Sequence, residues 1–279
     1  AAQLGLKTAV VEKQKALGGT CLLWGCIPTK ALLEHAHALK VVQRAKEFGV
    51  SIADAAKATI DMSQVQTRKD RVVSGLTKGV EFLFKKNKID WIKGTARLTG
   101  NGGLEIFEGE TQTLRARKDI IVATGSAPRG VPGIEIDRKR IITSDEAIGL
   151  REVPKTIVVM GSGAVGVEFA SIFNRFGSDV TIVELLPRLV PVEDEAISAE
   201  LEKSFRKQGI TSHTGAKVTG AKAGGDGVDG EMQLGDGTTK KIRADYLLVA
   251  TGRGPVTSGV NAEGVGLRME KGYIKVDTM

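Results

Sequence analysis

Two cysteines, Cys21 and Cys26, are the residues whose type and spacing could support redox chemistry. The chain has only these two, so it is not built on a framework of structural disulfides. In a regular helix, Cα atoms five positions apart are separated by roughly 8–9 Å, beyond the usual limit for a disulfide. A bridge would need a distorted backbone, which Gly25 and Pro28 permit, and a distorted disulfide is labile and redox-active.

Two other interpretations of the cysteine pair stay open. Cys21 and Cys26 could be unrelated, buried side chains. They could also bind a metal ion, but no third and fourth ligand lies nearby in the sequence, so a metal site is the poorer interpretation.

A glycine-rich segment predicts a dinucleotide-binding loop. Gly161, Gly163 and Gly166 form a GxGxxG pattern between the apolar run 156–160 and the helical pattern 167–175. In such a loop the first glycine allows a tight turn, the second lets a pyrophosphate approach the backbone, and the third allows the helix to pack closely on the strand. Glycine-rich turns also occur for purely conformational reasons, but the flanking strand and helix favour a nucleotide.

Glu184 predicts which dinucleotide binds. It lies eighteen residues after Gly166, at the end of the apolar run 179–183. An acid here accepts hydrogen bonds from a ribose 2′-hydroxyl and repels a 2′-phosphate, so the site should prefer NAD to NADP. Arg188 is the nearest base, and we interpret it as a solvated loop residue rather than as a phosphate contact.

The elements that must position these residues occur twice. The segment 121–125 (IVATG) returns as 248–252 (LVATG), and β-like runs preceded by a helical pattern lead to each copy. The expected β runs are 91–92, 104–107, 111–114 and a hairpin that turns at 235–237. The expected apolar helix faces are Leu76, Val80 and Leu83 in the first half, and Ile197, Leu201 and Phe205 before a capping Gly209 in the second.

This layout predicts an α/β fold with two nucleotide-binding domains, each carrying a small antiparallel β insert. We expect the first domain at 1–150 and the second at 151–258, with Pro154 interrupting the chain near the boundary. Residues 259–279 are expected to begin a return to the first domain.

Composition limits the classes of function. Hydrophobic residues make up 41% of the chain, enough for packed cores, and the longest apolar runs are too short to cross a bilayer, so no membrane span is expected. The net charge is +7, but the basic residues are interleaved with acids and aromatics are only 4%, which disfavours nucleic acid as a partner. The first residues lack a signal-peptide pattern, so we expect a cytoplasmic protein.

The segment 18–30, GGTCxxxGCIPxK, strongly resembles the redox-disulfide motif of the class I pyridine nucleotide–disulfide oxidoreductases. The VATG segments of that family match 122–125 and 249–252, and its NAD motif matches 161–168, so the resemblance covers the whole chain. It implies two Rossmann-like domains that bind FAD and NAD(P). One departure is Leu23, where the family usually has asparagine.

The resemblance also implies roles for single residues. Cys21 would be the interchange thiol and Cys26 the thiol next to the flavin, while Lys30 would lie beside the flavin and pair with Glu168. On its own, Glu168 would be interpreted as a helix-surface carboxylate. The residues expected to bind the cofactors FAD and NAD are Glu12, Lys30, Thr124, Gly125, Gly161, Gly163, Gly166, Glu168, Glu184 and Gly252.

Within the family, the segments 26–33 and 125–129 together with Glu184 look most like members that oxidise protein-bound dihydrolipoamide with NAD as acceptor. The implied partners are the lipoyl domain of a 2-oxoacid dehydrogenase complex or of the glycine cleavage system, and a second subunit in a homodimer. The alternatives are a mercuric reductase, another NAD(P)H-dependent disulfide reductase, or a non-catalytic NAD-binding fragment.

Parts of the family pattern are not found in this sequence. Glu12 ends an expected strand, 6–11, as the ribose acid of an FAD site would, but the glycine loop that should precede it is absent. The second flavin contact and the catalytic histidine of the family are also absent. His35, His37 and His213 resemble no such base, and solvated or groove-lining roles are expected for the first two. We therefore expect this chain alone to be inactive.

Overall fold

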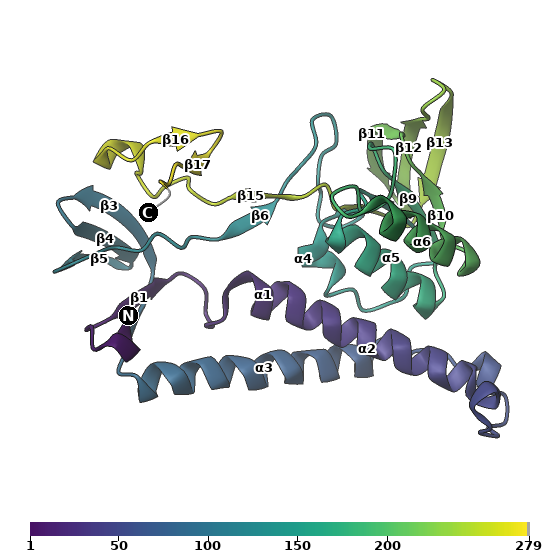
Figure 1. The fold of residues 1–279 in the computed structure, drawn as a ribbon, viewed down its shortest axis with the longest axis horizontal. Helices are drawn as coiled ribbons and strands as arrows, with labels where there is room; N and C mark the ends of the chain where they lie inside the picture. The colour runs from purple at the N-terminus through teal and green to yellow at the C-terminus, as the bar shows by residue number, and fades with distance from the viewer. Residues whose placement is uncertain (278–279) are drawn as a thin grey trace. The chain divides into compact units, whose positions relative to one another are not determined.

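The computed structural model describes residues 1–277 and divides into two compact units, which are considered separately (Figure 1). Unit 1 comprises 1–23, 73–127 and the described residues from 254 onward, and unit 2 comprises 24–72 and 128–253. The chain passes from unit 2 to unit 1 within helix α3 (Met62–Lys86), and it also crosses at the paired strands β6 (Ser126–Pro128) and β15 (Arg253–Pro255). No helix among the described residues is long and apolar enough to cross a membrane.

Unit 2 contains the complete nucleotide-binding fold that the second half of the sequence predicts. Its strands are β7 (Ile141–Ile142), β8 (Thr156–Met160), β9 (Asp179–Val183), β10 (Thr211–His213), β11 (Lys217–Gly224), β12 (Gly227–Gln233), β13 (Thr239–Ala244) and β14 (Tyr246–Val249). Its helices are α2 (Cys26–Gln43), η2 (Ala45–Phe48), η3 (Ala55–Lys57), α4 (Ser144–Ala147), α5 (Ala164–Phe176) and α6 (Glu195–Lys207).

The main sheet of unit 2 is entirely parallel, in the order β10-β9-β8-β14-β7. Successive residues of β8 point to opposite faces of the sheet, as the pleat requires. Ile157 and Val159 join a core formed with α2, α5 and α6, whereas Val158 and Met160 join a core formed with the antiparallel sheet β11-β12-β13. Both faces are therefore buried, which explains the continuous apolar run of this strand.

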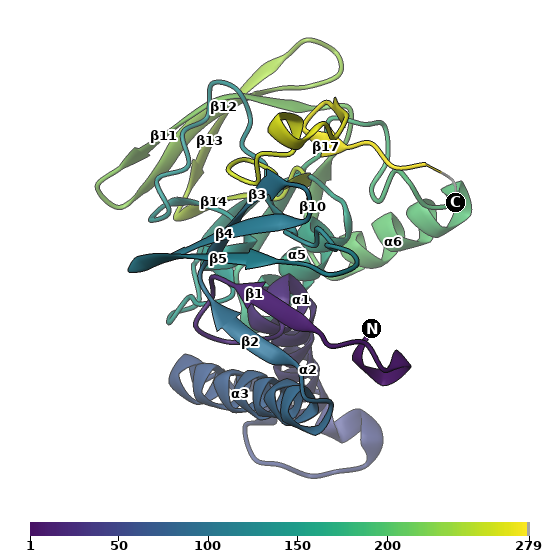
Figure 2. The ribbon, with the colours of Figure 1, turned by 90° about the vertical axis from the view of Figure 1, so that its left-hand side faces the viewer.

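Unit 1 contains the partial counterpart of this fold (Figure 2). Its elements are η1 (Ala2–Leu4), β1 (Ala9–Glu12), α1 (Gly19–Trp24), β2 (Asp90–Lys93), β3 (Thr95–Gly100), β4 (Gly103–Glu108), β5 (Glu110–Arg115), η4 (Glu263–Val265), β16 (Met269–Glu270) and β17 (Tyr273–Ile274). Strands β1 and β2 pair in parallel, and β3-β4-β5 form an antiparallel sheet. The expected α/β class is confirmed, with an antiparallel insert in each half.

The two copies of the VATG repeat have different structures. In the second copy, β14 lies between β8 and β7 and is hydrogen-bonded on both sides. The expected strand at 121–125 is wrong, because these residues form no strand and Ile121 is 81% exposed. A strand needs a neighbour for its backbone groups, and no described strand pairs along this segment.

One further expectation differs from the structure. Leu76 and Leu83 on α3 are about half exposed, so the expected apolar face of this helix is not covered by the described residues. The boundaries at 150 and 258 remain a prediction, and the compact units divide the contacts differently, with α2 and 128–150 clustering with the second nucleotide-binding fold.

Candidate functional site

The loop between β8 and α5 has the geometry that its glycines predict. Gly161 has a φ of +98°, and a Cβ placed there would overlap the backbone carbonyl of Ala250. A Cβ at Gly166 would overlap the carbonyl oxygen of Gly161, so helix α5 can approach the loop only because this residue has no side chain. A Cβ at Gly163 would meet nothing within 4 Å. The protein itself therefore requires Gly161 and Gly166 but leaves open space at Gly163.

This open space fits the pyrophosphate of a dinucleotide. Gly163 is the N-cap of α5, and no side chain caps the amides of the first turn. Such amides need an acceptor, and the positive end of the helix dipole favours an anion there. The residues present thus fit NAD, with Gly163 at the approach to the phosphates.

Glu184 lies where the sequence predicts it, at the carboxyl end of β9, and only 7% of it is exposed. Its Oε2 accepts hydrogen bonds from the backbone N–H and the hydroxyl of Ser162, both at 2.7 Å, and its Oε1 accepts one from the N–H of Leu186 at 2.8 Å. The carboxylate is thus held against the glycine loop. Ser162 was missed by sequence reasoning, because a serine inside a glycine motif carries no pattern of its own.

Arg188 is not the solvated residue that the sequence suggests. Its guanidinium forms an ion pair with Glu195 at 3.0 Å and donates to the carbonyl of Pro191 at 3.1 Å, and one third of its side chain is exposed. It connects the loop after β9 to the start of α6.

The cysteine segment has the backbone distortion that the spacing requires. Helix α1 ends at Trp24 and α2 begins at Cys26, and the intervening Gly25 has φ −128° and ψ −117°, far from helical values. Pro28 lies in the first turn of α2, where a missing N–H is tolerated. Cys21 and Cys26 are both exposed and not joined by a disulfide, so the interpretation as buried side chains is wrong. No metal-binding group of three or more His, Cys, Asp or Glu residues occurs in 1–277.

Lys30 and Glu168 are brought together although they are far apart in the sequence. Lys30 Nζ lies 2.6 Å from Glu168 Oε1, which connects the first turns of α2 to the first turns of α5. The Lys30 side chain is 59% exposed, so the pair adds little to stability. It does fix the position of the lysine relative to the glycine loop, and Glu168 is therefore more than a helix-surface carboxylate.

Glu12 and Gly125, which are expected to bind FAD, make hydrogen bonds like those of their counterparts in the expected NAD site. Glu12 ends β1 and its Oε1 accepts the N–H of Gln14 at 2.8 Å, as Glu184 Oε1 accepts that of Leu186. At the ends of the VATG copies, the carbonyl of Gly125 accepts the N–H of Val256, and that of Gly252 accepts the N–H of Arg129.

These two glycines share a backbone conformation as well. Gly125 and Gly252 have φ values of +80° and +107°, and Thr124 beside the first is exposed. The two halves therefore end in equivalent turns, while the cofactor roles of these residues remain predictions.

The histidines lie outside this arrangement. His37 is exposed and lines a cavity of about 430 Å³ with residues of α2, α5 and the end of α6, as a groove-lining residue would. His35 is half-buried instead of solvated. Its Nδ1 lies 2.6 Å from the carbonyl oxygen of Ala31, and its buried Nε2 has no hydrogen-bond partner among the described residues.

The stability of the chain should fall as the pH is lowered from about 7 to 5. Burial, with a further contribution from Arg68, lowers the pKa of His35 below its ordinary 6.5, and burial likewise lowers that of His213. The unfolded chain then takes up protons near pH 6.5 before the folded chain does, so the free energy of unfolding decreases as pH falls through this range. Urea unfolding at a series of pH values, with His35→Phe and His213→Phe, checks this. An unchanged slope in both variants would contradict it.

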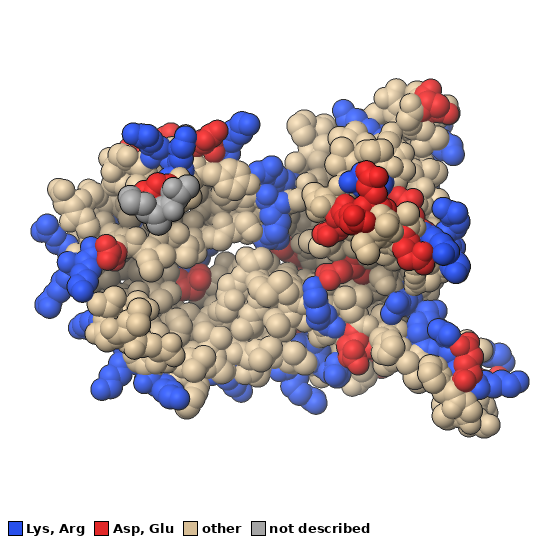
Figure 3. Space-filling model, viewed as in Figure 1, with Lys and Arg blue, Asp and Glu red and all other residues tan. Residues whose placement is uncertain are grey.

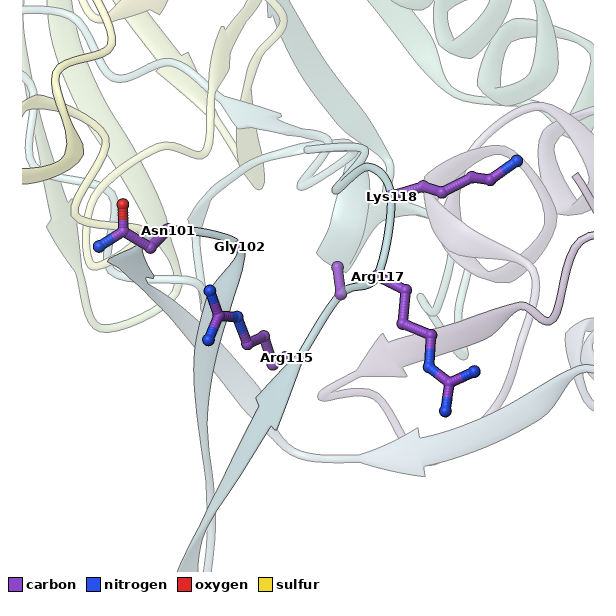
Figure 4. A pocket seen from close by; sticks show the side chains of 6 residues that line it. Asn101, Gly102, Arg115, Arg117 and Lys118 are labelled. Atoms are coloured by element: carbon purple, nitrogen blue, oxygen red, sulfur yellow. The ribbon is translucent and has the colours of Figure 1, made fainter.

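A larger cavity in unit 1 does not form an anion site. It measures about 580 Å³ and is lined by Arg115, Arg117 and Lys118 beside Asn101 and Gly102. In Figure 4 the three basic side chains point in different directions. On the face shown in Figure 3, Lys and Arg are likewise spread among Asp and Glu. Neither this cavity nor the face shown in Figure 3 offers a convergent basic site for a nucleotide.

Comparisons with known proteins agree with this geometry. A family model described as pyridine nucleotide-disulphide oxidoreductase matches residues 1–279. A dihydrolipoyl dehydrogenase of Pseudomonas putida is 46% identical over 276 residues, which are 97% of this chain and 58% of the relative. One of Chlorobaculum tepidum is 43% identical over 279 residues, 99% of this chain and 58% of the relative.

The chain thus spans less than two thirds of the length of these relatives. Among solved structures, that of LpdA from Mycobacterium tuberculosis matches with a TM-score of 0.86 and 26% identity, covering 97% of this chain and 58% of the other. With the glycine loop, the acid and the cysteine segment in their expected places, the chain belongs to the pyridine nucleotide-disulphide oxidoreductase family.

Proposed function

We propose that the protein containing this chain is a flavin-dependent disulfide oxidoreductase that oxidises protein-bound dihydrolipoamide to lipoamide. Electrons would pass from the substrate dithiol to a Cys21–Cys26 disulfide and, by way of FAD, to NAD. Lipoyl domains of 2-oxoacid dehydrogenase complexes or of the glycine cleavage system would supply the substrate, and the protein would act as a homodimer. The observation that carries the proposal is the 46% identity to a dihydrolipoyl dehydrogenase over nearly the whole chain.

The thiol chemistry is balanced within the cysteine pair. A thiolate of the substrate attacks the sulfur of Cys21, the bond between the two cysteine sulfurs breaks, and Cys26 leaves as a thiolate. The second substrate thiol then displaces Cys21, which gives lipoamide and two reduced cysteines. Cys26 is the first residue of α2, and Cys21 lies in the preceding helix α1. Bound FAD would carry the electron pair from the Cys26 thiolate to NAD.

Other residues of the chain bind and orient. Gly163 and the first amides of α5 would hold the NAD pyrophosphate, and Glu184 would accept a ribose hydroxyl. The Lys30–Glu168 pair couples α2, which carries Cys26, to α5, whose first amides would hold the NAD phosphates. Within residues 1–277 we assign no general base, so the proton that accompanies thiol oxidation needs an acceptor from elsewhere.

The proposal is tested by NAD reduction with dihydrolipoamide as donor. We would assay the 279-residue chain with added FAD, beside a hybrid in which the flanking segments of the Pseudomonas putida relative are joined to it. The hybrid should reduce NAD at rates typical of enzymes, on the order of 1–10³ s⁻¹, and should prefer NAD to NADP. A hybrid that binds FAD but reduces NADP, or that accepts electrons only from NADPH, would instead indicate another disulfide reductase.

A further inference from the structure

Ser162 occupies a position in the glycine loop from which it contacts both the acid and the following loop. It lies between Gly161 and Gly163 and is completely buried, with 0% of its surface exposed. All three of its polar groups are used. The N–H and hydroxyl donate to Glu184 Oε2, and the carbonyl accepts the N–H of Val190 at 3.1 Å.

These bonds determine which part of the Glu184 carboxylate remains available. Each carboxylate oxygen accepts about two hydrogen bonds. Ser162 supplies two donors to Oε2 and thereby saturates it, whereas within residues 1–277 Oε1 receives only the N–H of Leu186. The remaining acceptor position is therefore on Oε1.

The backbone around the acid is fixed independently of Ser162. The N–H of Glu184 donates to the carbonyl of His213, and the carbonyl of Glu184 accepts the N–H of Ala216, both at 2.9 Å. The main chain is thus held between β10 and the segment that follows it. These backbone bonds do not determine the side-chain rotamer of Glu184, and Ser162 acts on that rotamer.

We propose that Ser162 is a positioning residue for nucleotide selectivity: by holding Glu184 Oε2, it directs Oε1 to the 2′-hydroxyl of the adenosine ribose and against a 2′-phosphate. The inference rests on the proposed NAD site and adds a second residue to its specificity. It also shows why replacing Glu184 alone is a poor test of selectivity, because the buried N–H and hydroxyl of Ser162 would lose their acceptor.

The experiment compares three ligands, NAD, NADP and 2′-deoxy-NAD, by calorimetric titration of the full chain. The unsubstituted protein should bind NAD more tightly than either of the others. Ser162→Ala keeps the Cβ and the backbone bond but removes the hydroxyl donor. The affinity for NAD should fall about five-fold or more, while that for 2′-deoxy-NAD changes little, because the lost interaction concerns the 2′-hydroxyl.

Ser178→Ala is the matched control. Ser178 is also buried, at 4% exposure, and its hydroxyl donates to the carbonyl of Pro154 at 2.6 Å, before β9 rather than after it. This variant should lose stability but keep the ratio of the affinities for NAD and 2′-deoxy-NAD. If Ser162→Ala does not fold, Ser162→Cys keeps a weaker donor at the same Cβ and should reduce the same ratio by a smaller factor.

A double-mutant cycle separates a positioning role from a general structural one. In a Glu184→Gln background, Ser162→Ala should cause no further loss of selectivity, because the residue through which it acts is already changed. If Ser162→Ala leaves the ratio of the affinities for NAD and 2′-deoxy-NAD unchanged, the role of Ser162 is overturned, but the proposed NAD site is not. An unsubstituted protein that binds no NAD overturns the proposed nucleotide site, and the inference with it.

Discussion

Gly166→Ala should destabilise unit 2 by about 1–3 kcal/mol and abolish NAD binding, because the new methyl group would overlap the carbonyl oxygen of Gly161. That oxygen belongs to the backbone of the loop itself, so the clash can be relieved only by moving helix α5 away from β8. The first-turn amides of α5 would then leave the position from which they bind phosphate. Thermal unfolding and NAD titration measure the two losses.

Gly163→Ala is the informative control, since a Cβ at this position meets nothing within 4 Å of the protein. Its backbone, at φ −66° and ψ −179°, is open to any residue. We expect stability to change by no more than about 0.5 kcal/mol. NAD affinity should nevertheless fall about ten-fold or more, because the methyl group fills the space expected for the pyrophosphate. Equal NAD affinity in Gly163→Ala and the unsubstituted chain would mean that the dinucleotide does not lie over this loop.

Replacing either cysteine should remove dihydrolipoamide oxidation almost completely. In the active hybrid described above, Cys21→Ser or Cys26→Ser should each lower turnover about 10³-fold or more. A serine cannot form the disulfide that accepts the electrons of the substrate. Both cysteines are exposed, so folding and NAD affinity should not change. Since the two thiols act as one unit, the double variant should be no slower than either single variant.

The same pair can be tested chemically. After mild oxidation of the folded chain, alkylation and mass spectrometry should find Cys21 linked to Cys26, and dithiothreitol should release both. Helices α1 and α2 are separated at Gly25, so the two cysteines do not lie on one regular helix. Cysteines that remain open to alkylation after oxidation, or a Cys26→Ser variant within ten-fold of the original turnover, would contradict the redox assignment.

The second nucleotide-binding fold could be predicted because its signals are local. Gly161, Gly163 and Gly166 follow an apolar strand directly, and Glu184 ends the next strand at the expected distance. The conformation that each of these residues adopts is determined by the short segment around it. The break at Gly25 was predictable for the same reason, since a helix could not bring Cys21 and Cys26 within bridging distance.

The parts that were mispredicted depend on residues far away in the sequence. The segment 121–125 nearly repeats 248–252, yet only the second begins within a strand, β14, because strand formation depends on a neighbour and not on the sequence of the segment alone. The bonds of Ser162 to Glu184 join residues 22 positions apart, and no periodicity marks them. The pairing of Lys30 with Glu168 was expected only from the family resemblance.

Val190 has a strained backbone conformation in the loop after β9. It is a β-branched residue at φ +40°, a conformation that costs on the order of 1–3 kcal/mol and persists only where the surroundings enforce it. Ser162 accepts its N–H, and its own carbonyl accepts the hydroxyl of Ser198 at 3.4 Å. Energy stored in this way is released when the loop opens, so the free-energy gap to a locally unfolded state is narrower here than in the surrounding sheet. Native-state fluctuations of unit 2 should therefore begin in the loop after β9 while the neighbouring strands stay closed.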